Sequence, residues 1–118
     1  MDTKKVVKEL QKKYPGKTVI EGEGEIICEV NPSTENPEES VAIAVIDKIQ
    51  PHYHSKSTEY YEVIKGKLTL FIDGKKHELH EADSYTIEPG QTHWAEGSET
   101  WIKCTSNPGW IPQDHLQE

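Results

Sequence analysis

Three histidines and one glutamate in the middle of the sequence have the types and the spacing of a metal site. His52 and His54 are one residue apart, Glu59 lies five residues past His54, and His93 lies 34 residues past Glu59. In an extended chain alternate side chains point to one face, so His52 and His54 can reach the same ion. A polar turn lets Glu59 return to that place, and His93 follows the turn at Pro89-Gly90. An isolated pair of histidines is usually only solvated, but the carboxylate and the further histidine favour a metal site.

This ligand set restricts the identity of the ion. Three neutral imidazoles and one carboxylate suit one divalent transition metal ion, namely iron, manganese, nickel or zinc, and suit cuprous ion poorly because sulfur is absent. A six-coordinate ion would keep two positions free for a substrate or dioxygen. A tetrahedral zinc ion would have a closed shell and a structural role.

Two residues are candidates for catalysis near that ion. Glu59 could leave the metal to act as a base, and Tyr61 shares the face of Glu59 by strand alternation, so it could donate a proton or a hydrogen bond. Packing in the core is an equally good interpretation of Tyr61. Trp94 could cap a pocket or pack on the outer face, and His115 is expected to be exposed unless the tail folds over the barrel. Two further histidines are expected at the surface, His77 and His80.

Short runs with alternating polarity predict a protein built mainly of antiparallel strands. The segment 3–14 has apolar residues at helical spacing and predicts one short helix that packs on the sheet. Asp73-Gly74 between two such runs is a strong hairpin signal. Many short strands at intervals of roughly 8 to 12 residues indicate a sandwich or barrel. The predicted strands span 18–20, 25–30, 41–49, 59–65, 67–73, 76–80, 84–88 and 100–105.

Length and charge exclude several classes of protein. A length of 118 residues predicts one domain. A net charge of −8 predicts a protein that phosphate backbones and anionic lipid would repel. We therefore expect neither nucleic acid nor a membrane as partner, and no signal peptide core precedes the helix, which predicts a cytoplasmic protein. The acidic segment 21–25 predicts a solvated turn, and Cys28 and Cys104 predict buried, reduced thiols. All 13 basic residues are lysines, so a substrate clamped by arginine is disfavoured.

The metal-binding segment resembles the first motif of the cupin superfamily, with His52, His54, Glu59 and Gly66 matching without a gap. The segment 89–93 resembles the second motif more loosely. The resemblance covers about residues 41–105 and implies an all-β, single antiparallel jelly-roll (cupin) β-barrel with one short N-terminal helix. It also implies His52, His54, Glu59 and His93 as ligands and a homodimer, which would cover exposed strand edges. The chain then divides into residues 1–40 with the helix and first strands, the barrel at 41–105, and a tail at 106–118.

The function expected from this resemblance is that of a metal-dependent protein, with the balance towards an enzyme. The favoured hypothesis is a small-molecule metalloenzyme, an oxidoreductase of the dioxygenase type or an isomerase or epimerase. Its substrate would be oxygen-rich and neutral or weakly charged, because arginine is absent. The alternative is a non-catalytic metal- or ligand-binding module, since one fold supports many functions.

Overall fold

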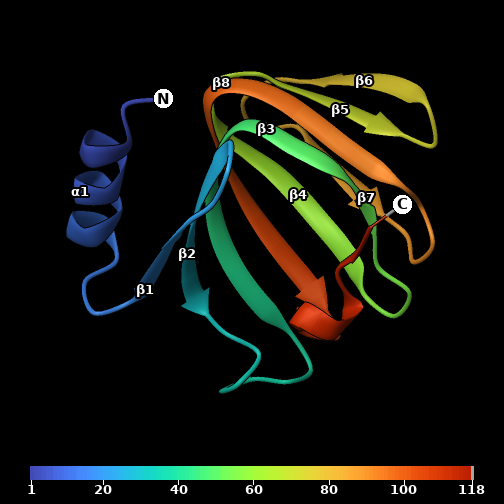
Figure 1. Ribbon diagram of the computed structural model, residues 1–118, viewed down its shortest axis with the longest axis horizontal. Helices are drawn as coiled ribbons and strands as arrows, with labels where there is room; N and C mark the ends of the chain where they lie inside the picture. Colours follow the sequence, from blue (N-terminus) through green and yellow to red (C-terminus); the bar gives the residue numbers. More distant parts are fainter. Residues whose placement is uncertain (118) are drawn as a thin grey trace.

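Strands form most of the computed structural model, which describes residues 1–117 (Figure 1). One helix, α1 (Thr3–Lys13), precedes them. The strands within the described residues are β1 (Thr18–Glu21), β2 (Glu25–Asn31), β3 (Ser40–Tyr53), β4 (Thr58–Lys65), β5 (Leu68–Ile72), β6 (Lys75–Leu79), β7 (Ser84–Ile87), β8 (His93–Asn107) and β9 (Leu116–Gln117).

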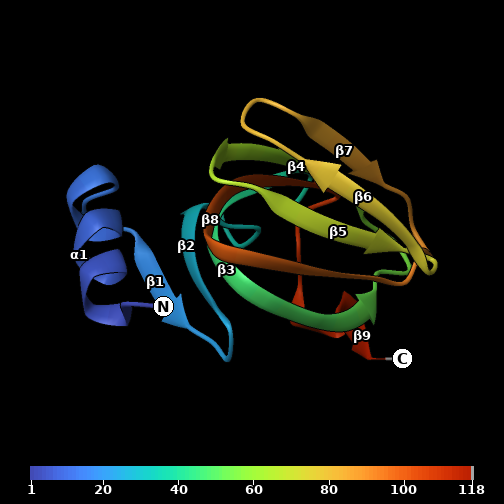
Figure 2. The same cartoon turned by 90° about the horizontal axis from the view of Figure 1, so that it is seen from above.

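The two long strands, β3 and β8, organise the sheet. Residues 40–46 of β3 pair with residues 100–106 of β8, and residues 48–52 of β3 pair with residues 93–96 of β8. The register shifts between these halves, where both strands bend and pass from one layer to the other. The first layer therefore has the order β1-β2-β3-β8-β4-β7, and the second contains the other halves of β3 and β8 with β5 and β6. Figure 2 shows the two layers facing each other.

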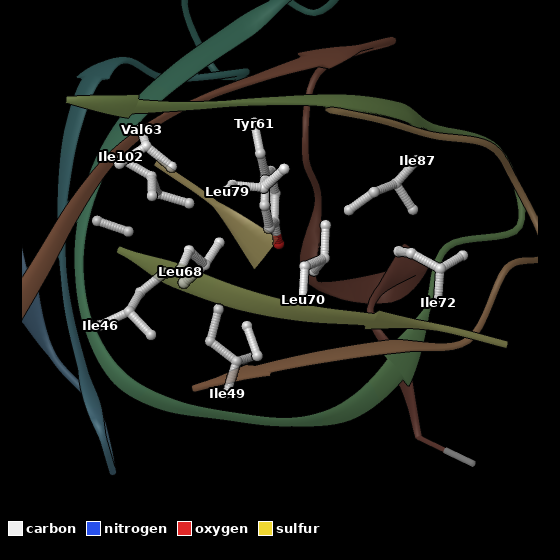
Figure 3. Packing of buried hydrophobic residues seen from close by; sticks show 12 residues of the cluster. Ile46, Ile49, Tyr61, Val63, Leu68, Leu70, Ile72, Leu79, Ile87 and Ile102 are labelled. Carbon is white, nitrogen blue, oxygen red and sulfur yellow. The ribbon is translucent and has the colours of Figure 1, made fainter. Parts of the chain in front are cut away.

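Apolar side chains fill the space between the layers (Figure 3). Tyr61 points from β4 into this interior, and its side chain is buried. The cluster comprises Ala44, Ile46, Ile49, Tyr61, Val63, Leu68, Leu70, Ile72, Leu79, Ile87, Ala95 and Ile102. Alternation along the strands directs these residues inward, as the period of two requires.

Helix α1 covers the outer face of the first layer. Asp2 caps the helix by accepting a hydrogen bond from the Lys5 backbone N–H at 3.3 Å. Val6 and Leu10 are fully buried against a second apolar cluster, which includes Ile26 and Cys28 of β2. The side chains of β2 are therefore divided between the helix on one face and the barrel interior on the other.

The predicted all-β fold with one short N-terminal helix is confirmed, with differences at particular elements. The hairpin turn lies at Asp73-Gly74, where both residues have positive φ as a two-residue turn of this kind requires. Strand β3 continues to Tyr53 and β8 begins at His93, whereas the predicted strands end at 49 and begin at 100. Strand β9 was not predicted. No helix among the described residues is long and apolar enough to cross a membrane.

Candidate metal centre

The structure brings the four predicted ligands together from three strands and one turn. His52 lies near the end of β3, His54 directly follows that strand, Glu59 is on β4, and His93 begins β8. Their candidate ligand atoms all lie within 4.8 Å of one another. Glu59 Oε1 is 3.0 Å from His54 Nε2 and 3.3 Å from His93 Nε2. All four side chains are buried, with exposed fractions of 1 to 4%.

Hydrogen bonds on the far side of each ring fix how the histidines face the cluster. His52 Nδ1 donates to the Gln50 carbonyl at 2.8 Å, and His93 Nδ1 donates to the Gln91 carbonyl at 3.0 Å. His54 Nδ1 donates to the carbonyl of Asp114 at 2.9 Å. A neutral imidazole that donates through Nδ1 has its lone pair on Nε2, so the three lone pairs point to one place. Metal-binding histidines commonly have such a second hydrogen bond.

The donor set fits a divalent cation. Within residues 1–117, the buried atoms His54 Nε2, His93 Nε2 and Glu59 Oε1 have no hydrogen-bond partner. Lone pairs that face one another in a buried site are costly unless a cation lies between them. Two ligands that each lie about 2.1 Å from an ion, at a right angle, would be about 3.0 Å apart. The observed separations of 3.0 and 3.3 Å match that spacing.

The electrostatics of the cluster also favour a bound cation. Burial lowers the pKa of His52 to about 3, so this imidazole is neutral and its nitrogen is free to bind a metal. Burial would raise the pKa of Glu59, but the adjacent rings of His54 and His93, 3.0 and 3.3 Å from Oε1, lower it below the ordinary value. Glu59 is therefore a carboxylate, and it supplies the negative charge that the predicted ligand set requires.

The second oxygen of Glu59 is held by strand β8. The thiol of Cys104 and the hydroxyl of Ser106 each donate to Glu59 Oε2 at 3.4 Å, which leaves Oε1 directed at the histidines. Burial raises the pKa of Cys104 well above its ordinary value, so it remains a thiol. Both cysteines are free, but only Cys28 is fully buried. Sequence patterns did not predict that Cys104 and Ser106 support Glu59.

The C-terminal tail folds back over the centre. Asp114 accepts hydrogen bonds from the backbone N–H groups of Ser55, Lys56 and Ser57 and from the Ser55 hydroxyl. His115 is therefore partly buried, and its ring stacks on that of His52 with centroids 4.2 Å apart. Of the two alternatives left open for His115, exposure or a tail folded over the barrel, the structure shows the folded tail, because Asp114 ties it down.

A cavity of about 380 Å³ opens beside three of the four candidate ligands. His52, His54 and Glu59 line one part of it, and Tyr61 lines it from β4. Burial raises the pKa of Tyr61 well above its ordinary value, so its phenol stays protonated. The remaining lining is mostly aliphatic or small, and it includes Ile27, Ala42, Ala44, Ile49 and Ile102.

Other residues singled out in the sequence lie away from this cavity. Trp94 stacks on Phe71 with ring centroids 3.9 Å apart, so it packs on the outer face and does not cap the pocket. His80 is exposed, and His77 is partly buried beside Tyr85.

Comparisons with known proteins agree with this architecture. The family model described as a cupin domain matches residues 40–100. Streptomyces PAC13 with uridine is similar in structure, with a TM-score of 0.79 and 17% identity over 88% of each chain. Pac13 is described as a unique nucleoside dehydratase. KdgF from Halomonas sp. has a TM-score of 0.71 and 16% identity over 79% of this chain and 89% of its own.

Two further matches are more limited in identity or in length. Ectoine synthase from P. lautus has a TM-score of 0.71 and 13% identity, over 79% of this chain and 70% of its own. An uncharacterized protein of Aquifex aeolicus is 39% identical over 44 residues, which span 37% of this chain and 36% of that protein. The structural likenesses establish a shared fold.

Proposed function

Because this chain belongs to the cupin family, we propose that it binds one divalent transition metal ion and acts with it on a small, oxygen-rich molecule. The ligands are His52, His54, Glu59 and His93. The ion is iron, manganese, nickel or zinc, and the reaction is of the dioxygenase or the isomerase and epimerase type. A bound ion would supply Lewis-acid chemistry or activate dioxygen.

The observation that carries this proposal is the set of buried lone pairs without partners. Each histidine uses Nδ1 for a backbone carbonyl, and in His54 and His93 this leaves Nε2 directed at the Glu59 carboxylate without a hydrogen-bond partner among the described residues. A purely structural cluster of buried polar groups would be expected to satisfy these atoms with hydrogen bonds.

The chain's own residues would bind and orient the substrate. Tyr61 lines the cavity beside Glu59, so its phenol can donate a hydrogen bond or a proton to an oxygen of the bound molecule. Glu59 could accept a proton through Oε1 if that oxygen is released, while Cys104 and Ser106 hold Oε2. Aliphatic residues of the cavity wall, such as Ile49 and Ile102, would exclude water from the bound substrate.

The size of the cavity supports a small substrate. A volume of about 380 Å³ lies within the range of small-molecule sites. Among residues 1–117 no lysine lines it, which disfavours an anionic substrate. The uridine in the similar Pac13 structure is an example of a neutral, oxygen-rich ligand in a related barrel.

Metal analysis of ligand variants tests the assignment. We expect His52→Ala and His93→Ala to lose most of the bound metal and to melt at a lower temperature, because a native-state ligand is lost. His80→Ala is the matched control, since His80 is exposed and remote from the cluster. Metal content that is unchanged in both ligand variants would contradict the ligand set.

A substrate screen, with and without oxygen, then separates an enzyme from a binding module. Tyr61→Phe should keep the metal and lose turnover if Tyr61 acts on the substrate. Binding without turnover across the screen would support the non-catalytic alternative. A homodimer and a cytoplasmic location belong to the same proposal, and the molar mass in solution tests the first.

A further inference from the structure

Strand β2 presents a carboxylate to the cavity. Residues 25, 27 and 29 of this strand line the cavity, whereas Ile26 and Cys28 point to the opposite face, under helix α1. The predicted strand 25–30 does begin at Glu25, but Glu25 is partly buried, so the prediction of a solvated turn for 21–25 is wrong at this residue. None of the four proposed ligands lies on this strand.

The backbone before Glu25 is fixed in place. Gly24 has a φ of +79°, and a Cβ added there would lie 2.4 Å from the Lys48 carbonyl oxygen. The Gly24 carbonyl accepts hydrogen bonds from the backbone N–H groups of Asp47 and Lys48, at 2.8 and 3.0 Å. Because β2 starts from this anchored point, Glu25 projects from a rigid wall of the barrel.

The Glu25 carboxylate has no partner within the described residues. Burial raises its pKa to about 7, the nearby charge of Glu59 adds to this effect, and no hydrogen bond or cation opposes it. Burial raises the pKa of Tyr61 and of Cys104 as well, and the Glu25 charge contributes to both effects. The charge of Glu25 therefore interacts with Glu59, Tyr61 and Cys104, which lie around the same cavity.

We propose that Glu25 is a specificity-determining residue that binds an ammonium group of the substrate, while an oxygen of the same molecule faces the metal ligands. This inference rests on the proposed function, and it narrows the substrate class to small amines that carry metal-binding oxygen atoms. A buried carboxylate without a partner gains most from a cationic hydrogen-bond donor.

The charge of the cavity wall favours a ligand with an ammonium group over an anionic or a wholly apolar ligand. Glu29 adds a second carboxylate on the same face of β2, and among residues 1–117 no lysine lines the cavity. The oxygen-binding and ammonium-binding groups stand on different strands, with aliphatic residues such as Ile27 and Ala44 also lining the cavity. A ligand with a polar group at each end and a short apolar middle matches this distribution.

Hydroxamic acids with different tails test the inference on the full chain loaded with Co²⁺. The hydroxamate oxygens bind the ion and change its visible spectrum, and a graded series of alkyl tails ends in an ammonium, a methyl or a carboxylate group. We expect the best ammonium tail to bind at least about tenfold more tightly than the methyl tail of equal length, and the carboxylate tail to bind most weakly. The assay is run near pH 8, above the Glu25 pKa of about 7.

The variant Glu25→Gln, which keeps the size of the side chain, should reduce the preference for ammonium to within about twofold. Glu23→Gln is the matched control and should retain the preference, because Glu23 is exposed in the turn before β2 and does not line the cavity. Metal content and the circular dichroism spectrum confirm that each variant is folded and loaded.

The outcomes separate this inference from the metal proposal. Hydroxamates that perturb the Co²⁺ spectrum but bind equally well with all tails would overturn the role of Glu25 and leave the metal centre standing. An ammonium preference that survives in Glu25→Gln would overturn it as well. If no hydroxamate perturbs the spectrum, the metal centre itself is wrong, and the inference falls with it.

Discussion

At the scale of single residues, the histidines of the centre are oriented in two different ways. His52 and His93 each donate to the carbonyl two residues earlier, at Gln50 and Gln91. The orientation of each ring is therefore set by the backbone next to it in the sequence. His54 donates instead to Asp114, sixty positions later in the chain. Two ligands are thus placed by local backbone geometry and the third by a contact that is distant in sequence.

Glu25 leads to a prediction about pH and stability. The carboxyl has an ordinary pKa of 4.5, which we take for the unfolded chain, and a pKa of about 7 in the folded protein without metal. Because folding raises this pKa, the folded state binds more protons between pH 4.5 and 7, and its stability falls as the pH rises through that window. The full effect is on the order of 3 kcal/mol above pH 7.

Urea unfolding of the wild type and of Glu25→Gln, in chelator and from pH 5 to pH 8, measures this effect. The wild type should lose stability relative to the variant as the pH rises, because glutamine carries no titrating group. Comparison with the variant cancels the titration of all other groups. Parallel stability curves for the two proteins would show that Glu25 is not buried as an unpaired carboxyl.

At the scale of elements, the tail from the 3₁₀ turn at Pro112–Asp114 to β9 acts as a brace for the loop between β3 and β4. The Asp114 carboxylate accepts hydrogen bonds from the backbone N–H groups of residues 55–57, and the backbone carbonyl of Asp114 orients His54. Burial would raise the pKa of Asp114, but these hydrogen bonds lower it below its usual value. The carboxylate therefore stays charged and holds the loop at neutral pH.

We expect Asp114→Ala to destabilise the protein by about 2 to 4 kcal/mol and to weaken metal binding, because three backbone N–H groups, that of Ser57 buried, lose their acceptor. Gln113→Ala is the control, since Gln113 is the exposed neighbour in the same turn. Urea unfolding and metal competition with a chelator measure the two effects. Equal metal affinity in both variants would contradict the bracing role.

The elements also show what sequence patterns can and cannot predict. Strand alternation and turn residues were sufficient for most strands and for the hairpin at Asp73-Gly74. The pattern did not predict that β8 begins at His93, because the strand bends near Gly97 where the register shifts. Nor could it show which face of β2 meets the cavity, because Ile26 and Ile27 are equally apolar and only the position of the helix decides. Asp114 and Glu25 were missed for the same reason, since their partners are set by tertiary contacts.

At the scale of the whole molecule, the proposed ion would connect the two layers of the barrel. His52 and His93 pair with each other in the layer that contains β5, whereas Glu59 pairs with Ser106 in the layer that contains β4. The interior cluster already packs between these layers. Within the described residues, however, no strand pairing joins β7 at the edge of the first layer to β6 at the edge of the second. One ion held from both sides would tie the layers together near the cavity.

Metal removal should therefore lower the stability of both layers together. An ion at about a thousandfold excess over its dissociation constant contributes about 4 kcal/mol, which corresponds to roughly 10 °C or more in melting temperature for a domain of this size. Thermal unfolding with chelator, and again after a transition metal is restored, measures the shift, and Mg²⁺ is the control because it fits imidazole ligands poorly. Hydrogen exchange on the chelated protein should show lost protection in both β4 and β5, because the ligands come from both layers. Faster exchange confined to one layer would mean that the ion is held by that layer alone, and an unchanged melting temperature would contradict the site.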